Sequence, residues 1–232
     1  MSLALRRQLI AACRHMNASG LNQGTAGNLS VRWRNGVLLT PTGMDYASLE
    51  PADIVFLDRH GQPQGRRLPS SEWRLHHDIL ARRPEVGAVV HNHAPFATAL
   101  ACLRRDIPAF HYMVAVAGGD SIRCAGYATF GSQELSDLAL AALADRKACL
   151  LANHGMLALG ESLAAAMKLA VEVEALAAQY CRALAVGNPV LLSAPDMQRV
   201  QQQFKGYGHQ PPLPRRRARA RPAAISSRRR SR

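Results

Sequence analysis

Hydrophobic residues recur with a helical period in several stretches of the chain. Over residues 2–18, apolar side chains such as Leu9 and Cys13 fall on one side of a helix. The stretch 70–84 begins with two serines, which favour a helix N-cap, and it ends at Pro84. Three further helices are predicted: over residues 96–104, from about residue 132, and over residues 161–187.

Shorter apolar or alternating runs between these helices predict strands. The strands are expected near residues 29–33, 37–43, 53–58, 86–93 and 148–155. The pair Asn35–Gly36 is typical of a hairpin turn and joins the first two strands. Because hairpins and helices are mixed without an internal repeat or a linker, residues 1–208 are predicted to form one α/β domain. We expect three layers, with a central, mainly antiparallel sheet flanked by helices.

The high net charge comes mostly from the C-terminal residues and changes this picture little. The chain of 232 residues has 29 basic and 16 acidic residues, a formal charge of +13. Nine arginines and no acid lie in residues 215–232, which leaves only 20 basic against 16 acidic residues elsewhere. Residues 209–232 are therefore predicted to be a disordered Pro/Arg-rich basic tail with no specific nucleic-acid or membrane partner.

Cysteine usage and hydropathy indicate the compartment. The five cysteines are an odd number, widely spaced and without a CxxC pair, which argues against a disulfide framework and a cysteine-based zinc site. Arg6 and Arg7 interrupt the apolar start, so no signal-peptide core forms there. No run approaches the roughly 20 apolar residues of a membrane helix. We expect a soluble, cytoplasmic protein with reduced thiols.

Three histidines offer metal-ligand chemistry. His91 and His93 are one residue apart at the end of an apolar strand, and alternation along a strand places both side chains on one face. His154 ends a second apolar strand. Strands that end at the same sheet edge can bring the three imidazoles together, and three imidazoles with an open position are the pattern of a catalytic zinc site.

A carboxylate and several polar loops accompany these histidines. Glu72 is predicted in the first turn of its helix, after Ser70 and Ser71, where free N–H groups and hydroxyls can hold an anion. The loops at residues 25–30 (TAGNLS) and 40–43 (TPTG) are small, hydroxyl-rich and suited to an oxyanion. The neighbouring His76 and His77 are interpreted as packing or surface residues and not as ligands.

Six motifs, taken in order, resemble one family. They are GTAGNLSVR, LLTPTGMDYASLEPADIVFLD, LPSSEWRLHHDIL, AVVHNHAPFATAL, IPAFHYMVAVAGGDSIRCAGYATFGSQEL and LLANHGML. From about residue 5 to residue 208 the chain resembles the class II, zinc-dependent aldolase family, which also contains pentulose-phosphate epimerases and the adducin head. Within that family it is most similar to the L-fuculose-1-phosphate aldolases.

The resemblance implies a site of named residues. It implies one zinc ion per subunit, held by Glu72, His91, His93 and His154, with Glu72 also acting as catalytic acid and base. The substrate phosphate would bind among Gly27, Asn28, Thr42, Gly43, Ser70 and Ser71. Tyr112 is expected to protonate the aldehyde oxygen, and Tyr207 would come from the C-terminal segment of a neighbouring subunit. The family forms homotetramers with sites between subunits.

The implied reaction is reversible cleavage of a ketose 1-phosphate to dihydroxyacetone phosphate and an aldehyde, of the L-lactaldehyde type. A metal would stabilise the resulting enediolate as a Lewis acid. Lys147, Lys168 and Lys205 are the only lysines, and none lies in the site motifs, which argues against a Schiff-base route. The aldehyde end is expected to depend on fewer residues, among them Phe130 and the C-terminal segment.

Other functions remain open at this point. A pentulose-phosphate 4-epimerase of the same family usually carries Asp at the position of Glu72, and a further acid near the tyrosine loop, where this chain has none before Asp120. An aldolase or dehydratase acting on 5-deoxy- or methylthio-pentulose phosphates fits the same motifs. A non-enzymatic adducin-like module would lack the ligand set, and nothing around His91 supplies the ββα motif of an HNH nuclease.

Overall fold

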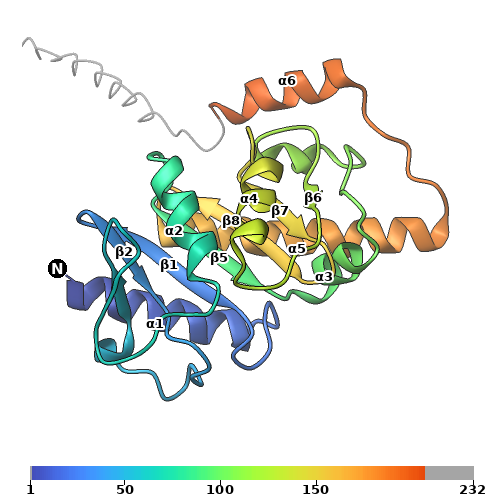
Figure 1. Ribbon diagram of the computed structural model, residues 1–232. Helices are drawn as coiled ribbons and strands as arrows, with labels where there is room; N and C mark the ends of the chain where they lie inside the picture. The colour runs from blue at the N-terminus through green and yellow to red at the C-terminus, as the bar shows by residue number, and fades with distance from the viewer. Residues whose placement is uncertain (1, 207–232) are drawn as a thin grey trace, which may run out of the picture.

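The computed structural model describes residues 2–206 (Figure 1). Tyr207 and the predicted tail, 209–232, lie outside the described residues. The strands are β1 (Asn28–Trp33), β2 (Gly36–Leu39), β3 (Val55–Leu57), β4 (Pro63–Gln64), β5 (Ala88–Asn92), β6 (Arg123–Ala125), β7 (Ala148–Leu151) and β8 (Gly155–Gly160). The helices are α1 (Ser2–Ala18), α2 (Trp73–Arg82), α3 (Pro95–Cys102), α4 (Gln133–Ala142), α5 (Leu163–Val186) and α6 (Ala194–Phe204), with 3₁₀ helices η1 (Pro51–Asp53) and η2 (Tyr112–Ala117).

The strands form one sheet in the part of the chain that the structure describes. Its order is β4-β3-β2-β1-β5-β8-β7-β6, and every neighbouring pair is antiparallel except β6 and β7. The predicted mainly antiparallel sheet is therefore confirmed. β5 lies in the middle of the sheet between β1 and β8, and His91 of β5 is paired in register with Leu157 of β8.

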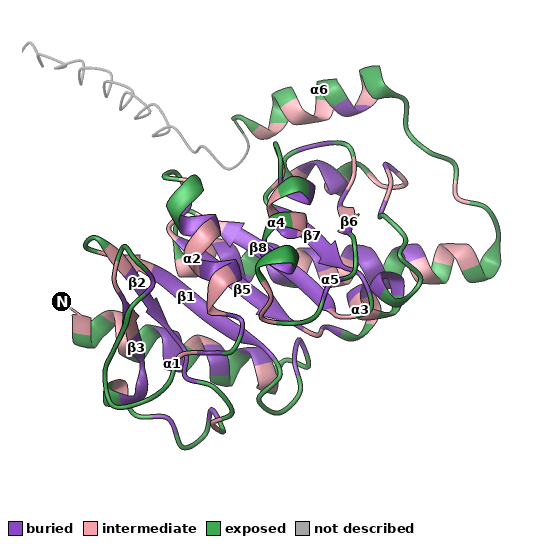
Figure 2. Cartoon of the chain, in the orientation of Figure 1, coloured by how far each residue is buried: buried purple, intermediate pink, exposed green. Residues whose placement is uncertain are grey.

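Helices cover both faces of the sheet (Figures 1 and 2). On one face α1, α3 and α5 pack against Leu29, Val90 and Ala158. On the other face α2 and α4 pack against Val89 and Leu157. Neighbouring strand residues thus contribute to opposite cores, as the period of two requires. The result is the three-layer arrangement that the sequence predicts.

The hydrophobic pattern did not predict the strands β4, β6 and β8, the 3₁₀ helices η1 and η2, or helix α6. Helix α6 buries only Met197, and Figure 2 shows it largely exposed and away from the sheet. Its start is nevertheless encoded locally, because Ser193 Oγ accepts a hydrogen bond from Asp196 N at 3.3 Å. The 3₁₀ helix η2 similarly begins at His111, whose side chain accepts from Met113 N. Met197, Val200 and Phe204 of α6 nevertheless fall at helical spacing and pack in or against the core, so the sequence carried a signal for this helix that the prediction did not use.

The first hairpin differs from its prediction by one residue. Trp33 pairs with Gly36, so the two turn residues are Arg34 and Asn35, and Arg34 adopts a positive φ of 52°. Gly36 is the first residue of β2 and has another role. A Cβ at Gly36 would lie 2.1 Å from the carbonyl oxygen of Leu57 and 2.6 Å from the Phe56 ring. The glycine therefore permits the close approach of β2 to β3.

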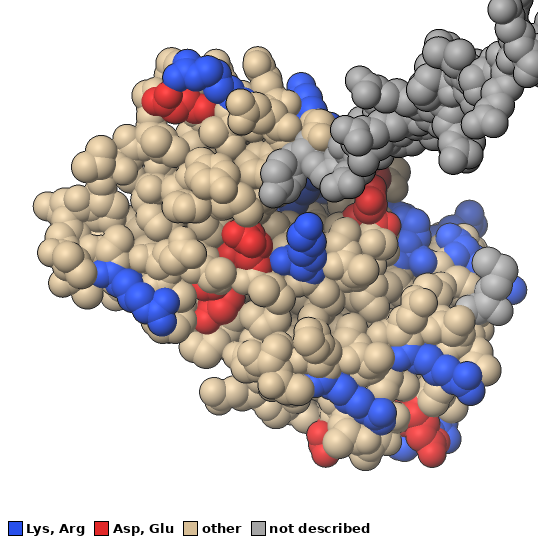
Figure 3. Space-filling model, turned by 180° about the vertical axis from the view of Figure 1, so that it is seen from behind, with Lys and Arg blue, Asp and Glu red and all other residues tan. Residues whose placement is uncertain are grey.

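On the face seen in Figure 3, basic groups are scattered and interspersed with acidic ones and form no continuous basic surface. No helix among residues 2–206 combines the length and the apolar character that crossing a bilayer requires. All five cysteines are free, and Cys13 and Cys149 are buried.

Replacing Gly36 by alanine tests the close approach of β2 to β3. We expect Gly36→Ala to lower the free energy of unfolding by about 2 kcal/mol, because the added methyl group must displace backbone. Gly187→Ala is the matched control, since a Cβ there meets nothing within 4 Å. Urea unfolding followed by circular dichroism measures both. Equal transition midpoints for the two variants would contradict the packing argument.

Candidate metal centre and substrate site

Three histidines meet at one edge of the sheet. His91 lies in β5, and His93 follows two residues later, just past the strand end. His154 is in the turn between β7 and β8, and not at the end of a strand as predicted, because β7 stops at Leu151. The ring centroids are 5.1 Å (His91–His93), 4.8 Å (His91–His154) and 4.9 Å (His93–His154) apart. One ligand atom from each lies within 4.8 Å of the others.

Glu72 brings a carboxylate to the same place. The prediction placed it in the first helical turn, after serine caps. It is instead the N-cap of α2, and its side chain makes no capping bond. The side chain points into the protein, where the residue is only 4% exposed. Its Oε2 lies 3.1 Å from His91 Nε2, and its Oε1 lies 3.3 Å from His154 Nε2. A buried carboxylate and three imidazoles thus form one cluster.

The pKa shifts in the cluster favour an ionised carboxylate and two neutral imidazoles, which are the forms that bind a cation. Burial by itself raises the pKa of Glu72, but His91, His154 and Asn28 outweigh it and hold that pKa far below the usual range. Burial lowers the pKa of His91, yet the Glu72 carboxylate raises it above its ordinary value overall. Burial and the nearby His91 lower the pKa of both His93 and His154 to about 4. His93 and His154 are therefore neutral at physiological pH, with lone pairs free.

Unsatisfied polar atoms indicate that the cluster fits a metal ion. Glu72 Oε1, His91 Nε2 and His93 Nε2 are buried and make no hydrogen bond. An unpaired buried polar atom costs about 1–3 kcal/mol, which a bound cation would remove. His91 Nδ1 lies 3.0 Å from the carbonyl oxygen of Met156 and donates to it, which leaves Nε2 as the ligand atom. The donor set and its outer partner are those of a metal centre.

A second layer of the site was missed from the sequence. His76 was interpreted as a packing or surface residue, but it is fully buried and bonds through both ring nitrogens, to Asn28 Oδ1 and to Ser30 Oγ. Asn28 Nδ2 in turn donates to Glu72 Oε2 at 2.9 Å. The signal was available, because His76 follows Glu72 by four residues and so faces the same side of α2.

The expected phosphate-binding segments lie beside this cluster. Gly27 is so close to β5 that a Cβ there would meet the carbonyl oxygen of His91 at 2.7 Å. Thr42 N donates to the carbonyl oxygen of Leu68 at 3.2 Å, which holds the loop of Thr42 and Gly43 beside the segment that leads to Ser70. Ser70 Oγ accepts from Glu72 N at 3.2 Å. Thr42, Gly43 and Ser71 are exposed, so a solvent-facing surface of small polar residues adjoins the buried carboxylate.

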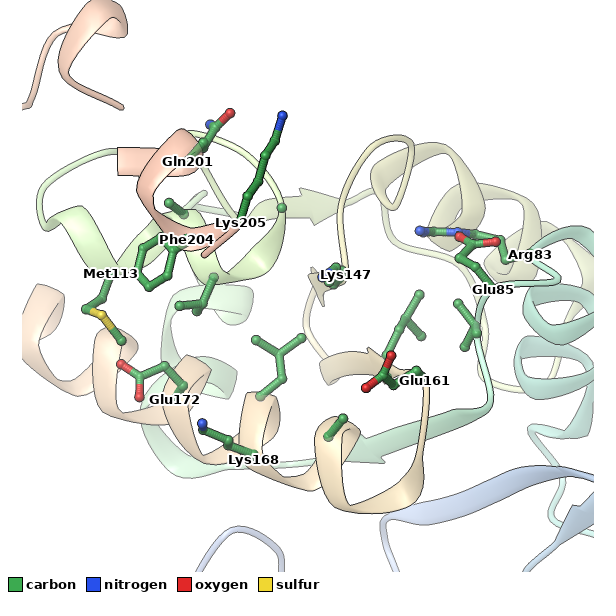
Figure 4. Close-up of a pocket in the computed structure, with 18 residues that line it drawn as sticks. Arg83, Glu85, Met113, Lys147, Glu161, Lys168, Glu172, Gln201, Phe204 and Lys205 are labelled. Carbon is green, nitrogen blue, oxygen red and sulfur yellow. The ribbon is translucent and has the colours of Figure 1, made fainter. Parts of the chain in front are cut away.

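Other expected residues are distributed differently. The Tyr112 ring contacts His111 and stacks on Phe204 of α6, with centroids 6.5 Å apart. Phe204 also lines a pocket with Val86 and Gly160, at the end of the β5–β8 pair opposite to His91 (Figure 4). Within one chain, Tyr112 is therefore not beside the metal centre.

The lysines and Phe130 lie in different places, the lysines in a pocket that Arg83 at the C-terminal end of α2 also lines and Phe130 near the first turn of α2. Lys147, Lys168 and Lys205 all line the pocket of Figure 4, away from the histidines. Phe130 is 65% exposed and precedes Gly131, whose carbonyl oxygen accepts from Arg74 of α2 at 3.1 Å. An exposed aromatic ring thus adjoins the first turn of α2, near Glu72.

Comparison with known proteins identifies the family of the chain. The family described as the class II aldolase and adducin N-terminal domain matches residues 7–181. The chain belongs to the class II aldolase family. It is 62% identical to a 5-methylthioribulose-1-phosphate/5-deoxyribulose-1-phosphate aldolase of Rhodospirillum rubrum, over 91% of this chain and 96% of that protein. It is 51% identical to the L-fuculose phosphate aldolase of Escherichia coli, over 88% of this chain and 95% of that protein.

Solved structures of the class II aldolase family support the fold. A structure of L-fuculose 1-phosphate aldolase matches with a TM-score of 0.84 and 42% identity, over 86% of this chain and 95% of that one. A structure of YgbL from Escherichia coli, described as a putative aldolase/epimerase/decarboxylase, matches with a TM-score of 0.76 and 26% identity, over 86% of this chain and 99% of that one. The central sheet and its flanking helices are thus those of the family.

Removing one imidazole tests the metal centre. We expect His93→Ala to weaken metal binding by more than about 100-fold. Loss of a residue that only holds a metal ligand in place costs up to about 100-fold, and His93 is proposed to be a ligand itself. Elemental analysis after dialysis and competition with a chromophoric chelator measure it. His15→Ala, an exposed position on α1, is the control and should keep its metal. Full metal content in the His93 variant would contradict the assigned ligand set.

Proton release on metal binding tests the electrostatics. At pH 6 His91 is mostly protonated, since its pKa is raised above 6.5, whereas His93 and His154, with pKa values of about 4, are almost wholly neutral. Metal binding should therefore release about one proton, against about two for three ordinary histidines. The release should fall as pH rises through the pKa of His91. Calorimetry in buffers of different ionisation enthalpy measures it, and a release of two protons at pH 6 would contradict the coupling.

Proposed function

We propose that the protein is a metal-dependent aldolase that reversibly cleaves a ketose 1-phosphate to dihydroxyacetone phosphate and an aldehyde. The observation that carries the proposal is the buried Glu72 carboxylate among three imidazoles, next to loops of small polar residues. A carboxylate kept ionised beside a cation site can move a proton at carbon, and the loops can hold a phosphate.

Zinc is the metal that suits this donor set. Three imidazole nitrogens and one carboxylate oxygen, from His91, His93, His154 and Glu72, are its common ligands in catalytic sites. Bound there, it would supply Lewis-acid stabilisation for charge that develops on a substrate oxygen. The remaining chemistry falls to the side chains of the protein.

Each residue of the site has its own role in the proposed reaction. The phosphate is held by Gly27, Asn28, Thr42, Gly43, Ser70 and Ser71. Cleavage breaks the C3–C4 bond, the C4 hydroxyl loses its proton as the aldehyde forms, and the bond electrons pass to C3 and the C2 oxygen. In the reverse, condensing direction the ionised Glu72 removes a proton from the hydroxymethyl carbon of dihydroxyacetone phosphate, and the Tyr112 hydroxyl gives its proton to the aldehyde oxygen as the C3–C4 bond forms. Solvent then carries the proton from Glu72 back to Tyr112, and cleavage reverses each of these transfers. No lysine is required, in agreement with the distant lysines.

The proposed assembly is a homotetramer with its active sites between subunits. Tyr112 lies at the end of its own β5–β8 pair opposite to His91, so a Tyr112 acting at the metal centre has to come from a neighbouring copy. Tyr207 is proposed to come from a neighbouring C-terminal segment in the same way. In this assembly each site combines the metal ligands of one chain with tyrosines of another.

A 5-deoxy- or 5-methylthiopentulose 1-phosphate is the first candidate substrate. The Rhodospirillum rubrum aldolase named for these substrates is 62% identical, against 51% for the Escherichia coli fuculose phosphate aldolase. Cleavage would give acetaldehyde or methylthioacetaldehyde, and the exposed Phe130 ring near Glu72 is suited to such an apolar end. L-Fuculose 1-phosphate, which would release lactaldehyde, is the second candidate.

An epimerase function is less well supported. An epimerase would need a further acid near the tyrosine loop, and the first acid there is Asp120. Its carboxylate pairs with Arg146 at 2.7 Å, and the residue after Arg146 lines the pocket far from the histidines. Asp120 therefore has a structural partner of its own.

A cleavage assay with three substrates tests the proposal. Purified protein should release dihydroxyacetone phosphate from 5-methylthioribulose or 5-deoxyribulose 1-phosphate faster than from L-fuculose 1-phosphate. A chelator should abolish the release and added zinc should restore it. Glu72→Gln should lower kcat by on the order of 10²–10⁴-fold, because it removes the proton carrier. Solvent-deuterium exchange at the hydroxymethyl carbon of dihydroxyacetone phosphate should fall equally.

The same assay separates the alternatives. An epimerised pentulose phosphate without any dihydroxyacetone phosphate would overturn the aldolase proposal in favour of the epimerase. Exchange that persists in the Glu72→Gln variant would show that another group carries the proton. A preference for L-fuculose 1-phosphate would reverse the order of the two candidate substrates.

A further inference from the structure

A buried chain of hydrogen bonds runs from β1 to the metal centre. Ser30 Oγ and His76 Nδ1 are 2.8 Å apart, and His76 Nε2 bonds to Asn28 Oδ1. Asn28 Nδ2 then donates to Glu72 Oε2 at 2.9 Å. Each of these four residues is less than 5% exposed. Water therefore does not compete for these hydrogen bonds.

The Glu72 carboxylate at the end of this series of hydrogen bonds determines which group donates in each of them. Asn28 Nδ2 donates to Glu72 Oε2 at 2.9 Å, so the Asn28 amide presents its NH₂ group to the carboxylate. Asn28 Oδ1 then faces His76, so Nε2 of His76 carries the proton and donates it. His76 Nδ1 must accept from the Ser30 hydroxyl. Burial lowers the pKa of His76 to about 3, which keeps this ring in its neutral form.

This series of hydrogen bonds makes the surroundings of the two carboxylate oxygens of Glu72 different. Oε2 is engaged by Asn28, whereas Oε1 makes no hydrogen bond and lies 3.3 Å from His154 Nε2. Without a donor on His76, the Asn28 amide could rotate by half a turn and present its oxygen to the carboxylate. That contact is repulsive. The orientation of Glu72 thus depends on a residue that does not touch it.

Packing alone does not account for His76. A site between β1 and α2 that needed only volume would be filled better by an apolar ring, which loses no hydration on burial. The adjacent His77 shows the contrast, because it is only partly buried and its ring contacts Asp78 and the backbone of Arg59. His76 instead satisfies both of its nitrogens, in the direction that Glu72 requires.

We propose that His76 is a positioning residue, which fixes the amide of Asn28 and, through it, holds Glu72 in the orientation that metal binding and proton transfer require. The proposal rests on the aldolase function proposed above. Its consequences for metal affinity can be measured without any substrate.

Three variants of His76 test the proposal. In His76→Gln the side-chain amide can reach the position of Nε2 and donate to Asn28. In His76→Asn the shorter amide can reach only the position of Nδ1, near Ser30. His76→Phe keeps the ring and removes both bonds, and His77→Gln is the matched control on the same helix. Each is purified as the full chain and measured for zinc affinity by chelator competition, for kcat and KM, and for thermal midpoint.

The variants are expected to rank by whether they keep the hydrogen bond to Asn28. His76→Phe and His76→Asn should each lose about 10–100-fold in zinc affinity and in kcat, the range found for outer partners of metal ligands, with KM nearly unchanged. His76→Gln should recover most of both. His77→Gln should match the unaltered protein.

Two results would overturn the proposal. One is a folded His76→Phe variant with unaltered zinc affinity and kcat. The other is equal behaviour of His76→Gln and His76→Asn, with losses that follow the thermal midpoint, which would make the role purely structural. If His76→Phe does not fold, the comparison of Gln with Asn decides. If the unaltered protein cleaves no ketose 1-phosphate, the aldolase proposal fails, while the zinc affinities still decide the role of His76.

Discussion

The carboxylate of Glu72 is 4% exposed and lies within 3.3 Å of two imidazole nitrogens. Taking a carboxylate out of water costs several kcal/mol unless other groups replace its hydration. Here Asn28 donates to one oxygen, and the other is left to the histidine cluster. The arrangement of every neighbouring element, from the end of β5 to the first residue of α2, follows from the need to surround this one charge.

The sheet order makes that arrangement possible. β1, β5 and β8 are neighbours, so Asn28, His91 and the turn that carries His154 arrive at the same edge although they are far apart in sequence. Helices on both faces exclude water from β5 around His91. The low local dielectric then strengthens the attraction between Glu72 and a cation. Fold and electrostatics thus act on the same few atoms.

The sequence predicted those parts that depend on periodicity and residue type. Strand alternation paired His91 with His93, and the apolar runs located β1, β5, β7 and the long α5. It did not predict that β7 ends before His154 and that β8 follows, because the pairing of a hairpin depends on tertiary contacts. Helix α6 was missed although its serine cap and its apolar spacing are local signals. His76 was misjudged although its spacing of four residues from Glu72 places both on one side of α2, because that spacing does not show which hydrogen bonds the ring makes.

Asn28 connects two parts of the site that are otherwise separate. It follows Gly27 in the proposed phosphate loop, and its side chain bonds to Glu72 and His76. A substrate phosphate that settles against the backbone of this loop would press on the same residue that holds the catalytic carboxylate. Since the backbone of Asn28 is also paired with His91 in the sheet, little movement is possible. If the phosphate binds there as proposed, one held residue would position both the phosphate and Glu72, which would favour substrates that carry the phosphate at the correct distance from the bond to be broken.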